Sequence, residues 1–561
     1  MERTKRAPGR CRADRSGSGT RRHHLGIERR QFNNIITKNA KDTGGTVTTT
    51  SADQGKQQGT SVYSMSSWPV GHMAPSAIKD HGVTRLSAFL KRTAQICWAL
   101  VAACLLYAAA VSMANDLRLA RQPYQFDYEE GNVLNAAVRI NAGLTPYPAP
   151  QSWPVVLNSY GPIPYLISAG LIRDREPELF RPRIISLVAA TIVACEIGLL
   201  ASGFTNSMLF GISLGAFFLT LPLAQEWAPL LRVDFLGLAF SLGGLVVFLR
   251  LPRLHFVVPF FFAGALLCKV TFLAAPITCV VILVRHKRWR ELTFGMLAGV
   301  AVLGTAIAAL QWSTHGEFLF HQFGTHVDSL SWTNYRTHAS QVLRETAVLV
   351  ALTLVGILRR RRLAPPFLYL FFVILGTVTA LKVGSESNHF LELEAALCIS
   401  SATGVCELQK MKSLPFATSG LVVLCGVILA VVGIANRALY SSQGVVDECP
   451  QAYAYIRDHE RVLSENVGAL VLTGRPVLLS NPFVYAQLVR SGKWPSDRVE
   501  QMLEESTADL VIIGKPRISE QRWSQPALAA LASHYHVSKR FACADAMVAY
   551  EPNSPRAAPL P

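Results

Sequence analysis

Hydrophobic and polar positions divide the chain into three regions. From Ala94 to Ile434, runs rich in Leu, Val, Ala and Phe recur at short intervals, with polar and basic gaps between them. The segment before this region has few large apolar residues, and after about Leu439 the apolar runs become short and β-like. A helix needs roughly 20 apolar residues to cross a bilayer. The pattern therefore predicts an α-helical polytopic membrane protein with a small C-terminal α/β domain.

Placing Lys and Arg consistently on one side of the membrane predicts about eleven transmembrane helices. Two prolines in Ser159–Ile172 favour an interfacial or re-entrant segment that does not cross. The runs on either side of Lys269 are short, so tilted or broken helices are expected there. The expected spans are Ala94–Met113, Ile184–Ala201, Met208–Leu223, Phe235–Leu249, Phe256–Leu267, Phe272–Val284, Leu292–Trp312, Val342–Leu358, Pro366–Leu381, Phe390–Val405 and Gly420–Ala435.

This assignment divides the chain into three parts. Residues 1–91 are expected to form a disordered, basic, cytoplasmic tail, because their composition buries too little apolar surface to fold. Residues 92–437 form the transmembrane domain, with a large first external loop at residues 114–183. Residues 438–561 form an extracytoplasmic α/β domain. Its strands are expected at Arg461–Ser464, Pro476–Ser480 and Asp509–Gly514, and its helices at Asp497–Ser506 and Gln525–His534.

Composition narrows the possible functions. The net charge of +17 comes from Lys and Arg in the tail and in the gaps between apolar runs, so a positive-inside pattern explains it and no nucleic-acid partner is predicted. The absence of GxxxxGK(S/T), HExxH and CxxC motifs gives no support for nucleotide-driven transport or zinc hydrolysis. Cys449 and Cys543 fall in the polar C-terminal part and can pair in an oxidising compartment, although the sequence does not prove contact.

Three carboxylates follow the first apolar run closely. Asp127, Glu129 and Glu130 lie within the segment Phe126–Asn132, at the start of the first external loop. Long loops in compact proteins usually carry function. Clustering beside the membrane favours chemistry over simple solvation, which remains the other interpretation. No cofactor is predicted, although three carboxylates leave a divalent metal open.

Cationic and polar residues are expected at the same external boundary. They are Arg232, Lys269, Lys382 and His389. A lysine inside apolar sequence is costly unless it has an anionic partner, and lipid-linked phosphate fits that requirement. In the alternatives, Lys269 snorkels, Arg232 pairs locally with Asp234, and His389 is a structural hydrogen-bonding residue. Carboxylates facing cations suit group transfer from a lipid phosphate to a hydroxyl, with the carboxylate as base and the cations stabilising the departing phosphate.

The chain resembles the GT-C superfamily of polytopic glycosyltransferases, which includes the protein O-mannosyltransferases and the lipid A aminoarabinose transferase. The bacterial RgtA/B/C/D-like family of mannosyltransferase-type enzymes is nearer still. The resemblance covers about Ala94 to Ala435. It rests on an ordered set of motifs: Asp127–Gly131, the Pro/Tyr-rich remainder of the first loop, Arg181–Ser186, Arg232–Phe235, Leu267–Thr271 and Lys382–Phe390.

This resemblance implies an inverting enzyme of the bacterial inner membrane that uses a polyprenyl-phosphate sugar donor on the external face. The acceptor would be an extracytoplasmic glycolipid, polysaccharide or protein. The base would be Asp127 or Glu130, and we favour Asp127. The family's commoner Asp-Glu-Gly is here Glu129-Glu130-Gly131, with the Asp displaced upstream, which leaves the choice among the three acids open. Arg232, Lys269 and Lys382 match positions expected to meet donor phosphate.

Two other functions compete with this interpretation. The same charges would line the path of a membrane transporter or lipid flippase, although neither inverted repeats nor charges near mid-bilayer are evident in the sequence. A non-catalytic membrane scaffold, whose α/β domain binds a partner, is the second alternative. A sugar-transfer assay separates these three functions.

Overall fold

The computed structural model describes residues 80–173, 175–326, 329–360, 364–410, 424, 426–435, 447–494, 497–514, 521–543 and 546–554. All of them belong to one compact unit, Ala77–Pro561. Most of the predicted cytoplasmic tail, up to residue 79, lies outside the described residues.

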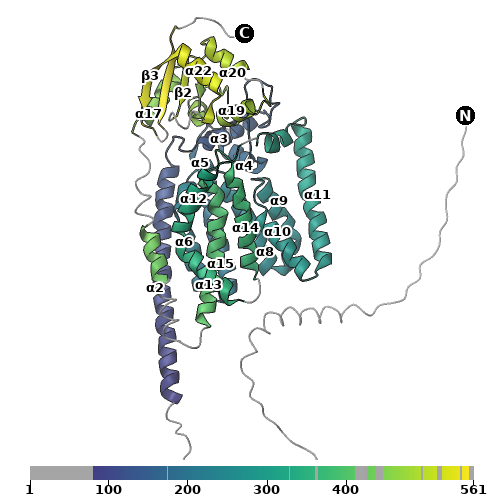
Figure 1. Cartoon of the computed structure of the whole chain (residues 1–561), viewed down its shortest axis with the longest axis vertical. Helices are drawn as coiled ribbons and strands as arrows, with labels where there is room; N and C mark the ends of the chain where they lie inside the picture. The colour runs from purple at the N-terminus through teal and green to yellow at the C-terminus, as the bar shows by residue number, and fades with distance from the viewer. Residues whose placement is uncertain are drawn as a thin grey trace, which may run out of the picture. The chain divides into compact units, whose positions relative to one another are not determined.

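Helices form the larger part of this unit, as Figure 1 shows. In chain order they are α2 (Asp80–Ala120), α3 (Tyr128–Asn141), α4 (Pro162–Ile172), α5 (Phe180–Thr205), α6 (Met208–Phe218), α7 (Pro222–Trp227), α8 (Asp234–Arg250), η1 (Pro252–Val257), α9 (Val258–Leu266), α10 (Ala274–Arg285), α11 (Trp289–Ser313), η2 (Phe320–Gly324), α12 (Trp332–Glu345), α13 (Ala347–Arg359), α14 (Pro365–Gly376), η3 (Thr377–Leu381), η4 (Ser387–Phe390) and α15 (Leu391–Gln409).

Glycines allow α5 and α6 to pack backbone against backbone. A Cβ on Gly211 would lie 2.3 Å from the carbonyl oxygen of Gly198, and one on Gly215 would lie 2.3 Å from that of Ala194. Small residues let apolar helices approach closely and gain van der Waals contact, which matters where lipid removes the hydrophobic driving force. Side chains of α5, α6, α8 and α15 together bury the largest apolar core.

Within the described residues, three helical segments are long and apolar enough to cross a membrane: Gln95–Ala120, Phe180–Thr205 and Trp289–Ser313. Counting α12 and α13 as one span, although they are bent by 79°, gives a fourth. The other apolar helices are shorter than a full span, and the expected span Gly420–Ala435 is described only in part. The count of eleven crossings is therefore not confirmed and stays a prediction.

Some predicted helix boundaries are wrong. The first expected span, Ala94–Met113, begins within one residue of the apolar stretch Gln95–Ala120 but ends too early, and α2 as a whole runs from Asp80 to Ala120. The expected span Val342–Leu358 is interrupted at Thr346, between α12 and α13. The expected span Met208–Leu223 is split between α6 and α7, because Pro222 cannot continue a helix and opens a new one instead.

The C-terminal region contains a four-stranded mixed sheet. Its strand order is β1-β2-β4-β3, with β1 parallel to β2 and the other pairs antiparallel. The strands are β1 (Val462–Ser464), β2 (Leu510–Ile513), β3 (Tyr535–Phe541) and β4 (Met547–Pro552), and the helices are α17 (Cys449–Arg457), α18 (Val467–Leu472), α19 (Pro482–Arg490), α20 (Asp497–Glu504) and α22 (Gln525–His534).

Two of the three predicted strands and both predicted helices of this region are present. The third predicted strand, Pro476–Ser480, is wrong as a member of the sheet: Leu479 forms only an isolated bridge with Val155 of the first loop. Leu479 is buried together with Val155 and Leu157 of that loop, whereas Val477 and Leu478 are partly buried. Cys449 and Cys543 form a disulfide, which decides a pairing that the sequence left open.

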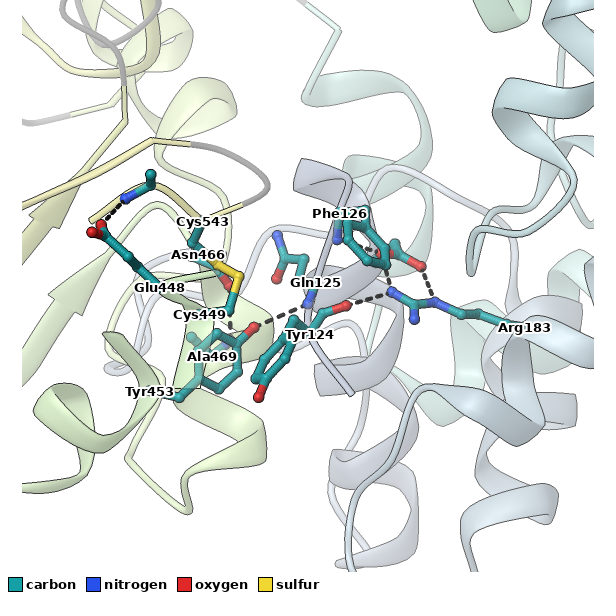
Figure 2. Close-up of a disulfide and its surroundings, with 12 residues drawn as sticks. Tyr124, Gln125, Phe126, Arg183, Glu448, Cys449, Tyr453, Asn466, Ala469 and Cys543 are labelled. Carbon is teal, nitrogen blue, oxygen red and sulfur yellow. Dashed lines mark hydrogen bonds and ion pairs between the residues drawn. A yellow bond between two sulfur atoms is a disulfide. The ribbon is translucent and has the colours of Figure 1, made fainter. Parts of the chain in front are cut away.

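The C-terminal region contacts the first loop directly beside this disulfide. Figure 2 shows Tyr453 of α17 reaching Gln125, whose backbone N–H donates to the tyrosine hydroxyl at 3.0 Å. Further along the loop, the N–H of Val155 donates to the carbonyl of Leu478 at 2.9 Å. Gln125, just before the segment Phe126–Asn132, is therefore bonded to a residue 328 positions later in the chain.

Candidate active site

The acidic turn, Asp127–Glu130, opens helix α3. Asp127 is the N-cap, and its side chain accepts a hydrogen bond from the backbone N–H of Glu129 while Glu130 completes a capping box. The same Asp127 Oδ1 accepts from Nη1 of Arg232 at 2.6 Å. Burial raises the pKa of Asp127 to about 6, against the lowering effect of Arg232. Asp127 is thus both a helix cap and half of an ion pair.

Glu130 anchors the turn to the core. It is fully buried, and its two oxygens accept from Nε and Nη2 of Arg183, each at 2.7 Å. Backbone N–H groups of Leu231 and Phe126 donate to the same oxygens at 2.7 and 2.8 Å. Burial by itself would raise the pKa of Glu130, but the charge and hydrogen bonds of Arg183 outweigh it and lower the pKa. Figure 2 shows Arg183 of α5 beside the loop residues just before this turn, where its Nη2 donates to the carbonyl of Tyr124 at 2.7 Å.

Glu129 has different surroundings. Its Oε2 accepts from the amide of Asn132 at 3.0 Å, and its Oε1 accepts from the amide of Asn481 at 3.2 Å. No ion pair within the described ranges includes Glu129. Its carboxylate is therefore oriented by neutral donors, with no cation of the described residues in direct contact.

A cavity of about 970 Å³ lies between the helices, the first loop and the C-terminal region. Its lining includes the charged residues Glu129, Arg232, Lys269 and Lys382. Apolar side chains from α10, α14 and the residues before α10 also line it: Leu273, Ala274, Ile277, Phe372 and Leu375. Phe483 and Arg522 of the C-terminal region also line it. Neither Asp127 nor Glu130 is among the described residues that line this cavity.

Arg232 and Lys269 are linked by a shared acid. Asp234 accepts from Nζ of Lys269 at 2.7 Å and from Nε of Arg232 at 3.4 Å. The amide of Asn388 donates to Asp234 as well, at 3.0 Å. The sequence alternative of a local Arg232–Asp234 pair is therefore present, yet both cations also line the cavity. Ion pairs thus run from Asp127 through Arg232 and Asp234 to Lys269, and the two carboxylates largely offset the charges of the two cations.

The late loop, Lys382–His389, brings further titratable groups to the cavity. The ammonium of Lys382 makes no hydrogen bond or ion pair with the described residues. Burial first, and then repulsion by Asp127, raise the pKa of Glu386 to about 8. Burial and the nearby charge of Lys269 hold the pKa of His389 well below its usual range, so this histidine is neutral. His389 Nδ1 lies 3.0 Å from the hydroxyl oxygen of Thr379.

The structure thus gathers most of the predicted site residues. Glu129, Arg232, Lys269, Lys382 and His389 line one cavity, whereas Asp127 reaches it only through Arg232 and Glu130 serves the core. Sequence reasoning missed the roles of Arg183, Glu386 and Asn481. The first two lie in motifs that the resemblance already contained, and Asn481 gave no signal because it is 352 positions from Glu129.

Among the described residues, no group of three or more His, Cys, Asp or Glu side chains is arranged to hold a metal ion. The carboxylates of the acidic turn point to different partners instead: Arg232 for Asp127, Arg183 for Glu130 and two amides for Glu129.

No protein-family model and no curated protein sequence matches the chain. Solved structures do. ArnT from Cupriavidus metallidurans matches with a TM-score of 0.53 when bound to undecaprenyl phosphate and 0.55 in the apo state. Both comparisons have 10% sequence identity and cover 79% of this chain and 97% of ArnT. An oligosaccharyltransferase from Archaeoglobus fulgidus, at 10% identity, covers 80% of this chain and 74% of its own length, but its TM-score of 0.47 is too low to carry an argument.

Proposed function

We propose a glycosyltransferase function for this chain, which belongs to the GT-C superfamily by its fold, as its motifs predicted. It transfers a sugar from a polyprenyl-phosphate donor to an extracytoplasmic glycolipid, polysaccharide or protein, with inversion at the anomeric carbon. One observation carries the proposal: the Glu129 carboxylate and the ammonium groups of Lys269 and Lys382 line the same cavity, which apolar side chains also line.

The cavity suits a lipid phosphate. Its apolar lining residues, which include Ile277, Phe372 and Leu375, accommodate a prenyl chain. The cations that line the same cavity accommodate the phosphate. Lys382 contributes most of the unbalanced positive charge, because the charges of Lys269 and Arg232 are offset by Asp234. ArnT, which has this fold, has been crystallised with undecaprenyl phosphate, and this supports a donor of the same class.

The reaction balances without a cofactor. The base removes the proton of the acceptor hydroxyl while its oxygen forms a bond to C1 of the sugar. The bond between C1 and the phosphate oxygen breaks, and the electron pair leaves with the polyprenyl phosphate. Lys382 and Lys269 stabilise the charge that develops on that oxygen. A carboxylate is a far weaker base than an alkoxide, so proton transfer accompanies bond formation and the orientation of the carboxylate decides the rate.

Glu129 is the base that this geometry supports best. It lines the cavity and has no cationic partner in the described part of the chain, whereas Asp127 is bonded to Arg232 at 2.6 Å. Asp127 then acts as a positioning residue that holds Arg232 at the cavity. This choice replaces Asp127, which the sequence favoured.

The external side of a bacterial inner membrane is the proposed location of the site. The disulfide between Cys449 and Cys543 supports an oxidising compartment for the C-terminal region. Because this region contacts the acidic turn directly, the two lie on the same side of the membrane. The N-terminal tail is then cytoplasmic.

Membrane vesicles that contain the full chain provide the test. They receive a radiolabelled hexose or pentose linked to undecaprenyl phosphate, and both released undecaprenyl phosphate and label bound to acceptor are measured. We expect Glu129→Gln to lower transfer by about 10²- to 10⁴-fold, and Asp127→Asn to lower it less. Full transfer by Glu129→Gln contradicts the base assignment. Movement of label across the membrane without bond transfer would support a transporter or flippase instead.

A further inference from the structure

Asn481 connects the C-terminal region to the proposed base. It is 1% exposed and forms the N-cap of α19, where its Oδ1 accepts from the backbone N–H of Val484 at 3.1 Å. Its Nδ2 donates to Oε1 of Glu129 at 3.2 Å. The buried amide of Asn481 therefore links α19 to Glu129 of α3, which is far away in sequence.

The hydrogen bonds around Asn481 fix which way its amide faces. The backbone N–H of Phe483 donates to the hydroxyl of Tyr128 at 3.1 Å, and that hydroxyl donates onward to Oδ1 of Asn481, also at 3.1 Å. Because Oδ1 already accepts from Val484, the amide nitrogen must face Glu129. The donor that meets the carboxylate is thus set by the backbone of α19.

We propose that Asn481 is a positioning residue that holds the Glu129 carboxylate toward the acceptor, so that the C-terminal region completes the catalytic centre. The inference rests on the proposed function. Asn132 holds the second oxygen at 3.0 Å from within α3, so the carboxylate is gripped from two sides by neutral donors. Neutral donors fix its orientation without the charge compensation that a Lys or Arg partner would bring.

Other charged groups around Glu129 enter the pH dependence of the site. Asp127 on the same turn and Glu386 on the late loop both have a pKa that is raised in part by Glu129. Arg232 lowers the pKa of both acids, and Arg522 of the C-terminal region stacks 4.2 Å from the centre of the Tyr128 ring while it pairs with Glu465. All of these groups are unchanged in the variants below.

The substitution Asn481→Asp separates positioning from folding. Aspartate caps helices as well as asparagine does, and it still accepts from Val484 and Tyr128. It replaces the donor beside Glu129 with a second carboxylate oxygen. Two carboxylates that share a site hold a proton more strongly, so the acidic limb of the rate–pH profile should move up by about one pH unit or more. We expect kcat at pH 7 to fall about tenfold, with little change in KM for the donor.

The matched control is Asn466→Asp, the same substitution at the N-cap of α18 in the same region. It should leave the profile unchanged. Both variants are measured with the undecaprenyl-phosphate sugar that the full-length wild type transfers, and their thermal stabilities are compared. A wild-type acidic limb in Asn481→Asp, with transfer abolished in Glu129→Gln, overturns the inference and leaves the base assignment intact. An equal loss at every pH together with a lower melting temperature also overturns it. Full transfer by Glu129→Gln overturns both proposals.

Discussion

Two adjacent carboxylates of one helical turn occupy opposite environments. Glu130 is fully buried and bidentate to Arg183, with backbone donors filling its remaining positions. Glu129 lines a cavity, and its hydrogen-bond partners among the described residues are two side-chain amides. The first arrangement compensates a buried charge and so stabilises the fold, and the second is the arrangement on which the proposed base rests.

The helix itself produces this difference. Successive residues of an α-helix point about 100° apart, so Glu129 and Glu130 necessarily lie on different faces of α3. The capping box then uses Glu130 to close the N-terminus, because position N3 is the one that reaches back to the N-cap. A pair of like acids in sequence is therefore no evidence for a pair of like functions.

The largest effect is expected from replacing Glu130, the buried carboxylate of this pair. Glu130→Gln leaves Arg183 buried without a carboxylate, which typically costs about 3 to 5 kcal/mol of stability. Thermal or denaturant unfolding of the purified protein measures it. The matched control, Glu129→Gln, should unfold much like the wild type, and an equal loss in both would contradict the division of roles.

This effect should not depend on mildly acidic pH. The pKa of Glu130 is lowered in the folded protein, so its contribution is complete above the unfolded value of about 4.3 and is lost only as pH falls through the folded value. The contribution of Glu130 itself should thus be constant from pH 8 to pH 5, and any change near pH 6 reports Asp127, whose pKa of about 6 is raised in part by Glu130. The double variant Glu130→Gln/Arg183→Met should recover part of the loss, because no uncompensated charge remains.

A smaller effect concerns the region that holds Glu129 through Asn481. Replacing Cys449 and Cys543 by serine removes the disulfide between α17 and the segment after β3, which should cost about 2 to 4 kcal/mol. Melting temperatures with and without reductant measure it. Reductant should lower the melting temperature of the wild type and leave the double serine variant unchanged. Cys104→Ser, at an exposed free cysteine of α2, is the control.

The smallest effect concerns the charge that faces Glu129. The pKa of Glu386 is raised to about 8, so this acid is neutral at pH 7 and gains its charge as pH rises through 8. A new negative charge ~10 Å from a phosphate costs roughly 1.5 kcal/mol at an effective dielectric constant of 20. We expect kcat/KM to fall about tenfold above pH 8, mainly through KM. Glu386→Gln should abolish this alkaline fall, and an unchanged alkaline limb would rule out Glu386 as its source.

Much of the site could be predicted because its motifs are local. The acidic turn follows the first helix, and the basic or polar residues Arg232, Lys269, Lys382 and His389 interrupt apolar sequence at the ends of helices. A charged side chain within apolar sequence is costly to bury without a partner, and this cost marks these residues as site candidates. The choice of Asp127 over Glu129 depended on which oxygen faces a cavity, and spacing alone does not contain that information.

Helix ends were the least predictable part of the fold. The break at Thr346 has neither proline nor glycine beside it, and the polar residues Arg344–Thr346 lie at the break itself. Leu478 and Leu479 read as a strand, but their backbone pairs with Val155 of the first loop. At Leu478 and Leu479, tertiary contacts overrode local propensity.

The sequence by itself determined that this chain is built mainly of apolar helices and that acids and cations interrupt the apolar pattern near helix ends, because hydrophobic periodicity and charge placement are properties of short segments. The tertiary structure alone decided that Glu130 pairs with Arg183 in the core and that Glu129 lines the cavity. It also decided that Asn481, 352 positions later in the chain, donates a hydrogen bond to Glu129. The reason is physical: the environment of a carboxylate is set by the donors that surround it in space, and these come from segments that only folding brings together.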